Sequence, residues 1–131
     1  MSYKYWIILD WAGGPLKSDS DHKGWYEIES FSLDIATRGG PRSDGAFGIQ
    51  ISVESPSMIL APILELKLKT GDPFDGVAID MMKPDRLIRN EFRNVRVDYS
   101  LPAGRIYEFH FEFGSMVTRQ VAIPRSRAAT L

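Results

Sequence analysis

Acidic and histidine side chains alternate with aromatic ones near the C-terminal end of the chain. Glu108, His110 and Glu112 are two residues apart, so an extended strand would place all three on one face. Carboxylates and an imidazole so arranged could hold a metal ion or transfer protons. The opposite face would carry Tyr107, Phe109, Phe111 and Phe113. Because a strand with one buried and one hydrated face shows the same alternation, we interpret the acidic side as the hydrated face and expect no metal site there.

A second candidate is an acidic stretch, residues 19–24, which begins like a calcium-binding loop. A cation, Lys23, stands at the fifth position of that loop. Ser30 takes the twelfth position, where a bidentate glutamate is needed. We therefore interpret the stretch as a solvated turn, and the sequence predicts no metal ligand in it.

A third candidate is a serine nucleophile at Ser43, within residues 40–45. The glycine spacing around it is one residue longer than in a nucleophile elbow, and no helical pattern follows. His22 and His110 are the two histidines that could act as a base, and the chain has no cysteine nucleophile. We predict no catalytic residue, no enzyme activity and no cofactor.

Four arginines, Arg86, Arg89, Arg93 and Arg96, recur every three or four residues. On a helix they would form a basic stripe able to bind phosphates. The β-branched alternation that follows favours a strand instead, and 17 acidic residues offset 16 basic ones. The sequence therefore predicts no nucleic-acid partner.

The length and composition indicate one folded domain. The chain has 131 residues, of which 44% are hydrophobic and 25% charged, enough for a core without metals or disulfides. An apolar run at residues 5–9 is too short for a signal peptide or a membrane span. We expect synthesis in the cytoplasm without a signal peptide and no membrane insertion.

Alternating apolar residues predict a mainly β protein, a small antiparallel barrel of two sheets with one short α-helix. A register change near Glu29 and Ser30 predicts a bulge or bend in the second strand. We expect residues 1–123 to form the domain and residues 124–131 a flexible tail. The strands are expected at residues 5–11, 25–35, 47–53, 77–81, 95–99 and 107–113, with a weaker strand at 116–123.

One helix is expected at residues 62–71. Pro62 suits its first position and Gly71 the position just past its end, and two lysines near its C-terminus complement the helix dipole. Leu64, Leu66 and Leu68 alternate as in a strand, but propensity and the end signals favour a helix.

Several stretches, in this order, resemble the haemolysin-coregulated protein (Hcp) family of type VI secretion systems. The first has an acidic turn, His22 and a Glu-Ile-Glu-Ser-Phe-Ser strand. Later stretches have a helix that opens with proline and closes with Thr-Gly, a strand after it, a long strand with a central Asn-Val, and a closing strand of alternating phenylalanines. These stretches are residues 21–32, 62–71, 74–80, 90–100 and 107–113, and the resemblance covers roughly residues 3–119.

This resemblance implies a structural role without catalysis. Family members form six-membered rings that stack into a hollow inner tube, which a contractile sheath expels from the cell, and their fold is similar to phage tail-tube proteins. The implied partners are further copies of this chain and the type VI sheath, spike and effector proteins, with small effectors carried in the lumen. Secretion through the type VI apparatus is implied as well.

A glycine-rich loop with charges of both signs lies between two predicted strands. Such a segment is a poor core element and a good contact element. In the Hcp family the corresponding loop reaches toward the neighbouring ring, so we expect a ring-stacking loop here. Its residues are Arg38, Gly39, Gly40, Pro41, Arg42, Ser43, Asp44, Gly45 and Ala46.

An alternative is a monomeric small-barrel module that binds a ligand such as a carbohydrate. Trp6, Trp11 or Trp25 would then offer a stacking platform. A small hydrolase is a third and more distant possibility. The mass of the protein in solution separates these classes, because a binding module stays monomeric and a ring does not.

Overall fold

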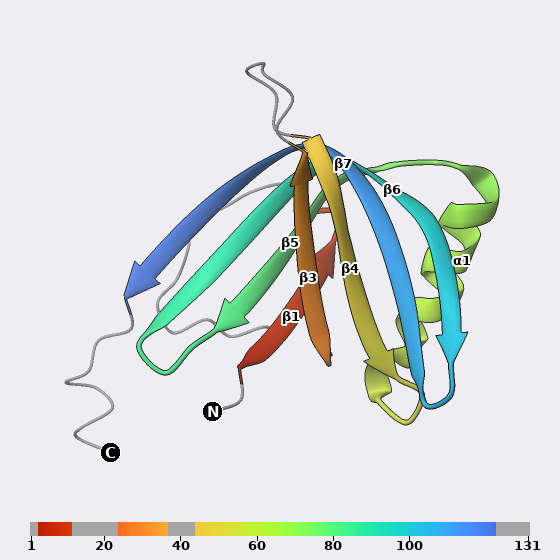
Figure 1. Cartoon of the computed structure of the whole chain (residues 1–131), viewed down its shortest axis with the longest axis horizontal. Coiled ribbons are helices and arrows are strands. Elements are labelled where there is room, and N and C mark those ends of the chain that lie inside the picture. The colour runs from red at the N-terminus through yellow and green to blue at the C-terminus, as the bar shows by residue number, and fades with distance from the viewer. Residues whose placement is uncertain (1–2, 12–23, 37–43, 123–131) are drawn as a thin grey trace.

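The chain folds into seven strands, a 3-10 helix and one α-helix in a computed structural model that describes residues 3–11, 24–36 and 44–122 (Figure 1). The mainly β prediction with one short α-helix is confirmed. In chain order the elements are β1 (Lys4–Leu9), β2 (Tyr26–Ile28), β3 (Ser30–Ala36), β4 (Asp44–Ser52), η1 (Pro56–Ile59), α1 (Leu60–Thr70), β5 (Phe74–Met82), β6 (Arg86–Ala103) and β7 (Ile106–Ala122).

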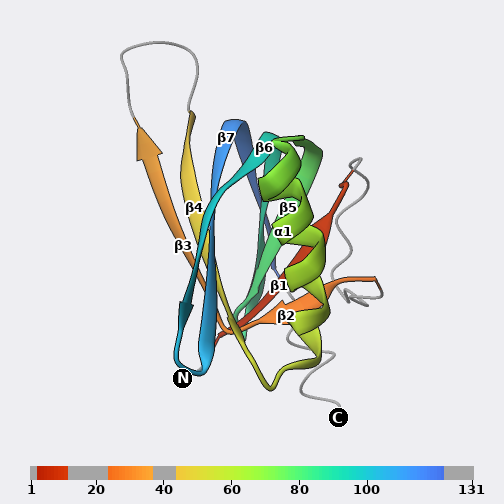
Figure 2. The same cartoon turned by 90° about the vertical axis from the view of Figure 1, so that its right-hand side faces the viewer.

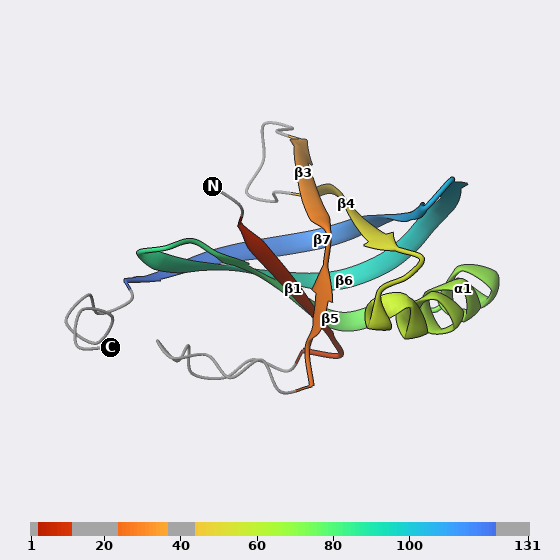
Figure 3. The same ribbon diagram turned by 90° about the horizontal axis from the view of Figure 1, so that it is seen from below.

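All seven strands belong to one antiparallel sheet with the order β2-β1-β5-β6-β7-β4-β3. Its two edge strands, β2 and β3, are separated in the chain by Glu29 alone, whose N–H donates to the Gln50 carbonyl at 2.8 Å. The sheet is therefore curled until its edges approach each other at one residue. Figure 3 shows this orange stretch crossing the end of the curled sheet. The register change predicted at Glu29 and Ser30 is the point where the chain leaves one edge for the other.

A corner in the two longest strands wraps the sheet around its core. In β6 the core residues Phe92 and Val95 are three apart rather than two or four, and in β7 the same shift separates Phe113 from Met116. Between them Asn94 has a positive φ of 54°, a conformation that asparagine tolerates better than most residues. Residues 116–123 were predicted as a separate weak strand, and residues 116–122 of that stretch are the far arm of β7 beyond this corner.

The β6–β7 hairpin is the longest local pairing in the described residues. Its ladder runs from Arg86 opposite Ala122 to Ala103 opposite Ile106. Two residues join the strands, and the first, Gly104, has a φ of 66°, which glycine adopts without steric cost. The predicted strands at residues 95–99 and 107–113 are the arms of this hairpin nearest the turn.

The predicted helix is confirmed at α1, which lies beside β6 (Figure 2). Gly71 ends it in a left-handed conformation with φ 74°, and its N–H donates to the Lys67 carbonyl at 2.9 Å. Pro62 lies in the first turn, two residues later than the helix start. The Tyr107 hydroxyl donates to Glu65 and so ties the helix to β7, and this hydrogen bond raises the pKa of Tyr107.

Phenylalanine rings fill the centre of the fold. Phe47 on β4 is 2% exposed, and its ring centroid lies 4.3 Å from that of Phe92 and 4.6 Å from that of Phe111. Six of the seven phenylalanines are buried, and Phe31 is partly buried against them. The aromatic excess of the sequence therefore goes largely into the core.

Candidate assembly surfaces

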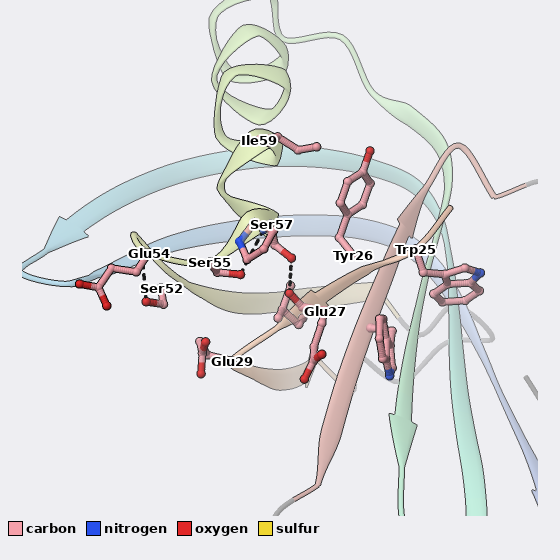
Figure 4. A pocket seen from close by; sticks show the side chains of 12 residues that line it. Trp25, Tyr26, Glu27, Glu29, Ser52, Glu54, Ser55, Ser57 and Ile59 are labelled. Carbon is pink, nitrogen blue, oxygen red and sulfur yellow. Dashed lines mark hydrogen bonds between the residues drawn. The ribbon is translucent and has the colours of Figure 1, made fainter. Parts of the chain in front are cut away.

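A groove of about 670 Å³ lies between the edge strand β2 and the 3-10 helix η1 (Figure 4). One wall comes from β2 and its flanks, and the other from the end of β4 and from η1. These two segments are far apart in the sequence and meet here because the sheet curls. Residues that line the groove include Trp6, Tyr26, Glu27, Glu29, Glu54 and Ile59.

Alternation along β2 and the residue that follows it directs two carboxylates into the groove. Ile28 points into the core, so its neighbours Glu27 and Glu29 project to the outside, where both are exposed. The Ser57 hydroxyl donates to the Glu27 carbonyl and holds η1 against β2. Ser55 caps η1 by accepting a hydrogen bond from the Ser57 N–H at 3.1 Å. The walls of the groove are therefore fixed by hydrogen bonds that leave both carboxylates projecting.

The lining of this groove favours a cationic partner. It contains three carboxylates, those of Glu27, Glu29 and Glu54, and none of the described residues that line it is a lysine or an arginine. Glu54 also pairs with Arg105, from the β6–β7 turn. The half-buried Trp6 adds an indole ring. Carboxylates beside an aromatic ring bind the guanidinium of arginine by ion pairing and by stacking.

An exposed apolar stripe on η1 and α1 continues this groove. Ile59, Ile63 and Leu66 are spaced four and three residues apart and are 60%, 41% and 61% exposed. This spacing places them on one side of the helix, while Leu60 and Leu64 pack into the core. Ile59 also lines the groove, so the stripe and the groove form one continuous surface.

A row of polar side chains crosses the sheet on the face opposite the core. The Ser30 hydroxyl donates to Gln50 at 2.9 Å, and the Gln50 amide donates to Glu108 at 2.6 Å. Glu108 lies 3.2 Å from His110, whose ring stacks on Tyr99 at 4.4 Å. The face predicted to be hydrated thus carries an ordered hydrogen-bonded row, which sequence alternation alone could not reveal.

This arrangement lowers the pKa of Glu108, first through its hydrogen bond with His110 and then through that with Gln50. A carboxyl with a lowered pKa in the folded state stabilises the fold above its ordinary pKa, and that stabilisation is lost as the pH falls through the lowered value. We expect Glu108→Gln to reduce the melting temperature slightly at pH 7 and to have no effect near pH 2. Thermal unfolding from pH 2 to 7 measures this, with Glu112→Gln, an exposed neighbour, as the control. An equal reduction at both pH values would contradict the assignment.

The four spaced arginines lie on β6, as the strand prediction requires, and they differ in environment. Arg89 is 4% exposed and makes a bidentate pair with Asp80 at 2.6 and 2.8 Å. Its guanidinium lies 4.9 Å from the Trp11 ring and 4.8 Å from the Trp25 ring. Arg86 instead pairs with its neighbour Asp85 at the surface. The arginines therefore do not form one basic stripe.

The same contacts bear on the tryptophans of the alternative ligand platform. Trp11 and Trp25 both contact the Arg89 guanidinium, and their rings lie 5.7 Å apart. The Trp11 N–H donates to the Gly76 carbonyl at 2.8 Å, and Arg93 donates to the Trp11 carbonyl at 3.0 Å. These two tryptophans serve the fold, and Trp25 and Trp6 also line the groove.

The predicted ring-stacking loop lies mostly outside the described residues. Arg38, Gly39, Gly40, Pro41, Arg42 and Ser43 are not described, and neither are His22 and the calcium-like residues 19–23. The last three residues predicted as loop, Asp44, Gly45 and Ala46, are instead the first residues of β4 and pair with β3. Hydrogen bonding to β3 extends the strand further toward the loop than the alternation of side chains indicated.

Comparison with solved structures decides the fold. Hcp1 from Salmonella typhimurium aligns with a TM-score of 0.63 and 15% identity over 94% of this chain and 96% of that chain. The Hcp1 protein of the E. coli EAEC 042 pathovar aligns with a TM-score of 0.61 and 13% identity over 93% of this chain and 97% of that chain. The secreted protein Hcp3 from Pseudomonas aeruginosa aligns with a TM-score of 0.56 and 12% identity over 90% of this chain and 98% of that chain. The chain has the Hcp fold.

The Hcp fold was predicted from the order of short sequence stretches, and that prediction is confirmed. Neither a scan of protein-family models nor a search of curated proteins gives a match. Among the described residues of this Hcp fold, no helix has the length and apolar character needed to cross a membrane. In the same residues, no three His, Cys, Asp or Glu side chains are grouped as a metal site requires.

Proposed function

We propose that this chain is a structural subunit of a type VI secretion inner tube, which assembles into rings that stack. The observation that carries this proposal is the Hcp fold over more than nine-tenths of the chain. In this role the protein is not an enzyme. It works with the type VI sheath and spike, is secreted through that apparatus, and carries small effectors in the lumen of the tube.

Exposed apolar and edge surfaces support assembly with further copies. The edge strand β3 carries Leu33 and Ile35, which are 37% and 44% exposed. An open sheet edge presents unpaired backbone groups that tend to be covered by another chain. The helical stripe of Ile59, Ile63 and Leu66 is a second apolar surface on another part of the molecule. Contacts between two different surfaces of identical subunits close into rings when the rotation between them allows it.

The assembly itself is tested by native mass spectrometry. We expect a cyclic homo-oligomer, with a hexamer as the main species, at tens of micromolar protein and moderate salt. Ile63→Glu combined with Leu66→Glu should shift the population toward smaller species if the stripe is a subunit contact, because a charge there would have to be desolvated. The control Pro62→Glu changes an exposed residue beside the stripe. A single monomer peak for the unmodified protein would exclude the proposed function.

Of the predicted loop, residues 38–43 are proposed to mediate contact between stacked rings rather than folding, since residues 44–46 belong to β4. Replacing residues 39–43 with a Gly-Ser linker of the same length should leave the melting temperature within a few degrees and the individual rings intact. Electron microscopy should show fewer stacked or tubular particles. If the rings themselves dissociate, or if stacking is unchanged, the loop does not have this role.

A further inference from the structure

We propose that the groove between β2 and η1 receives the arginine-bearing loop, residues 38–43, of a second copy of this chain in the next ring of a stack. This inference rests on the proposed function and names the surface that the stacking loop meets. The groove is formed by described residues of β1, β2, β4 and η1 together with their flanks.

The loop and the groove lie at opposite ends of the same strand. β4 begins at Asp44, directly after residue 43, and ends at Ser52, which lines the groove together with Glu54. A nine-residue strand spans roughly 30 Å at about 3.3 Å per residue. Figure 1 shows β4 running along the molecule from the end where it leaves β3 to the end where η1 begins. A head-to-tail stack therefore brings the start of β4 in one copy toward the groove of the next.

Charge complementarity fits the two surfaces to each other. Residues 38–43 contain two arginines, Arg38 and Arg42, and no acidic residue. The groove presents Glu27, Glu29 and Glu54 without a lysine or arginine among its described lining residues. Glu54 is already paired with Arg105, so Glu27 on β2 and Glu29 directly after β2 are the carboxylates proposed to receive the loop.

The lining also suits the shape of an arginine side chain. A guanidinium is flat and can stack on an aromatic ring while it forms hydrogen bonds to a carboxylate. In the groove the Trp6 indole lies on the strand paired with β2, opposite Glu27 in the register. Pro56 and Ile59 line the other wall and offer apolar contact for the aliphatic part of the side chain. A lysine-only or acidic partner would use fewer of these features.

A charge-reversal experiment tests the pairing. In the groove variant, Glu27→Lys is combined with Glu29→Lys; in the loop variant, Arg38→Glu is combined with Arg42→Glu. We expect each double variant to form rings by native mass spectrometry, but to lose stacked particles by about tenfold or more in sedimentation velocity and electron microscopy. The chain that carries all four changes should recover stacking, because the charges are complementary again.

Two matched controls change charge elsewhere. Asp72→Lys combined with Asp75→Lys adds the same charge at exposed carboxylates outside the groove lining, and Arg125→Glu combined with Arg127→Glu removes the same charge from the C-terminal tail. Both controls should stack like the unmodified protein. Normal stacking of the groove variant, or failure of the four-change chain to recover it, would overturn the inference. Loss of stacking in the tail control would assign the groove to the tail instead and overturn it as well.

A binding measurement separates this inference from the proposed function. A synthetic peptide of residues 37–46 is titrated against the full chain by calorimetry, at low and at moderate salt. We expect saturable binding that weakens as salt rises and is lost in the groove variant. If the unmodified protein is a monomer but binds the peptide, the ring proposal fails and the groove assignment stands. If rings stack but neither the peptide nor the groove variant has an effect, the groove assignment fails and the ring proposal stands.

Discussion

Replacing Arg89 with alanine is expected to lower the free energy of unfolding by about 3–5 kcal/mol. The side chains of Arg89 and Asp80 are 5% and 0% exposed, so the variant would keep a buried carboxylate without its bidentate partner. The rings of Trp11 and Trp25 would also lose the guanidinium that both of them contact. Urea denaturation followed by circular dichroism measures the change.

The control for this prediction is Arg86→Ala on the same strand. Arg86 pairs with Asp85 at 3.0 Å, but both side chains are more than 40% exposed, and solvent screens such pairs. We expect little change in stability from its removal. If Arg89→Ala and Arg86→Ala lost the same amount of unfolding free energy, the burial of the Arg89–Asp80 pair would not contribute to stability. Arg89→Lys should fall between them, because lysine keeps the charge but not the planar fork that pairs with both carboxylate oxygens.

Phe47→Ala is expected to cost about 3–5 kcal/mol of unfolding free energy, the range for removing a buried aromatic ring. The ring lies against Phe92 and Phe111 and bridges β4 to strands from both arms of the corner. Alanine would leave a cavity that the neighbouring rings cannot fill without leaving their rotamers. Phe31→Ala at the edge strand is the matched control, because Phe31 is only partly buried and should cost less.

Both variants are compared at the same protein concentration and below the concentration at which oligomers form, because assembly adds to the apparent stability. Equal losses for Phe47→Ala and Phe31→Ala would contradict a core centred on Phe47. A loss for Phe47→Ala below about 1 kcal/mol would contradict its tight packing.

The strands and the helix were predictable because local patterns determine them. Alternation at Phe47, Ile49 and Ile51 identified β4, and Gly71 identified the end of α1. The slip near Glu29 was visible because it moves apolar residues to the other face. What the slip accomplishes, a transfer from one sheet edge to the other, depends on pairing with β1 and β4, which are not local.

The corner at Asn94 could not be predicted from one strand alone. Its positive φ occurs where β7 bends at the same level and Gly114 faces Asn94. The single sheet, in place of the two expected, follows from this corner, because β6 and β7 pass through it without losing their pairing. The β-propensity of individual residues does not predict a bend that two paired strands must make together.

The candidate site was likewise predictable in part. The stacking loop was noticed because glycine and arginine composition is local. The groove was missed because its walls, residues 25–29 and 52–59, are brought together only by the curled sheet. The buried role of Arg89 was missed as well, although Asp80, within the otherwise apolar run 77–82, was a signal that a cation must lie nearby.

The single residue between the two edge strands also bears on how the protein folds. The β6–β7 hairpin closes through a two-residue turn, so its pairs form at a small entropic cost and should appear early. Residues 26–36 can complete their pairing only after β1 and β4 are both in place, since one short stretch serves each edge. The two edges of the sheet should therefore become protected from hydrogen exchange together and last. A newly synthesised chain would therefore expose either both sheet edges to its assembly partners or neither edge.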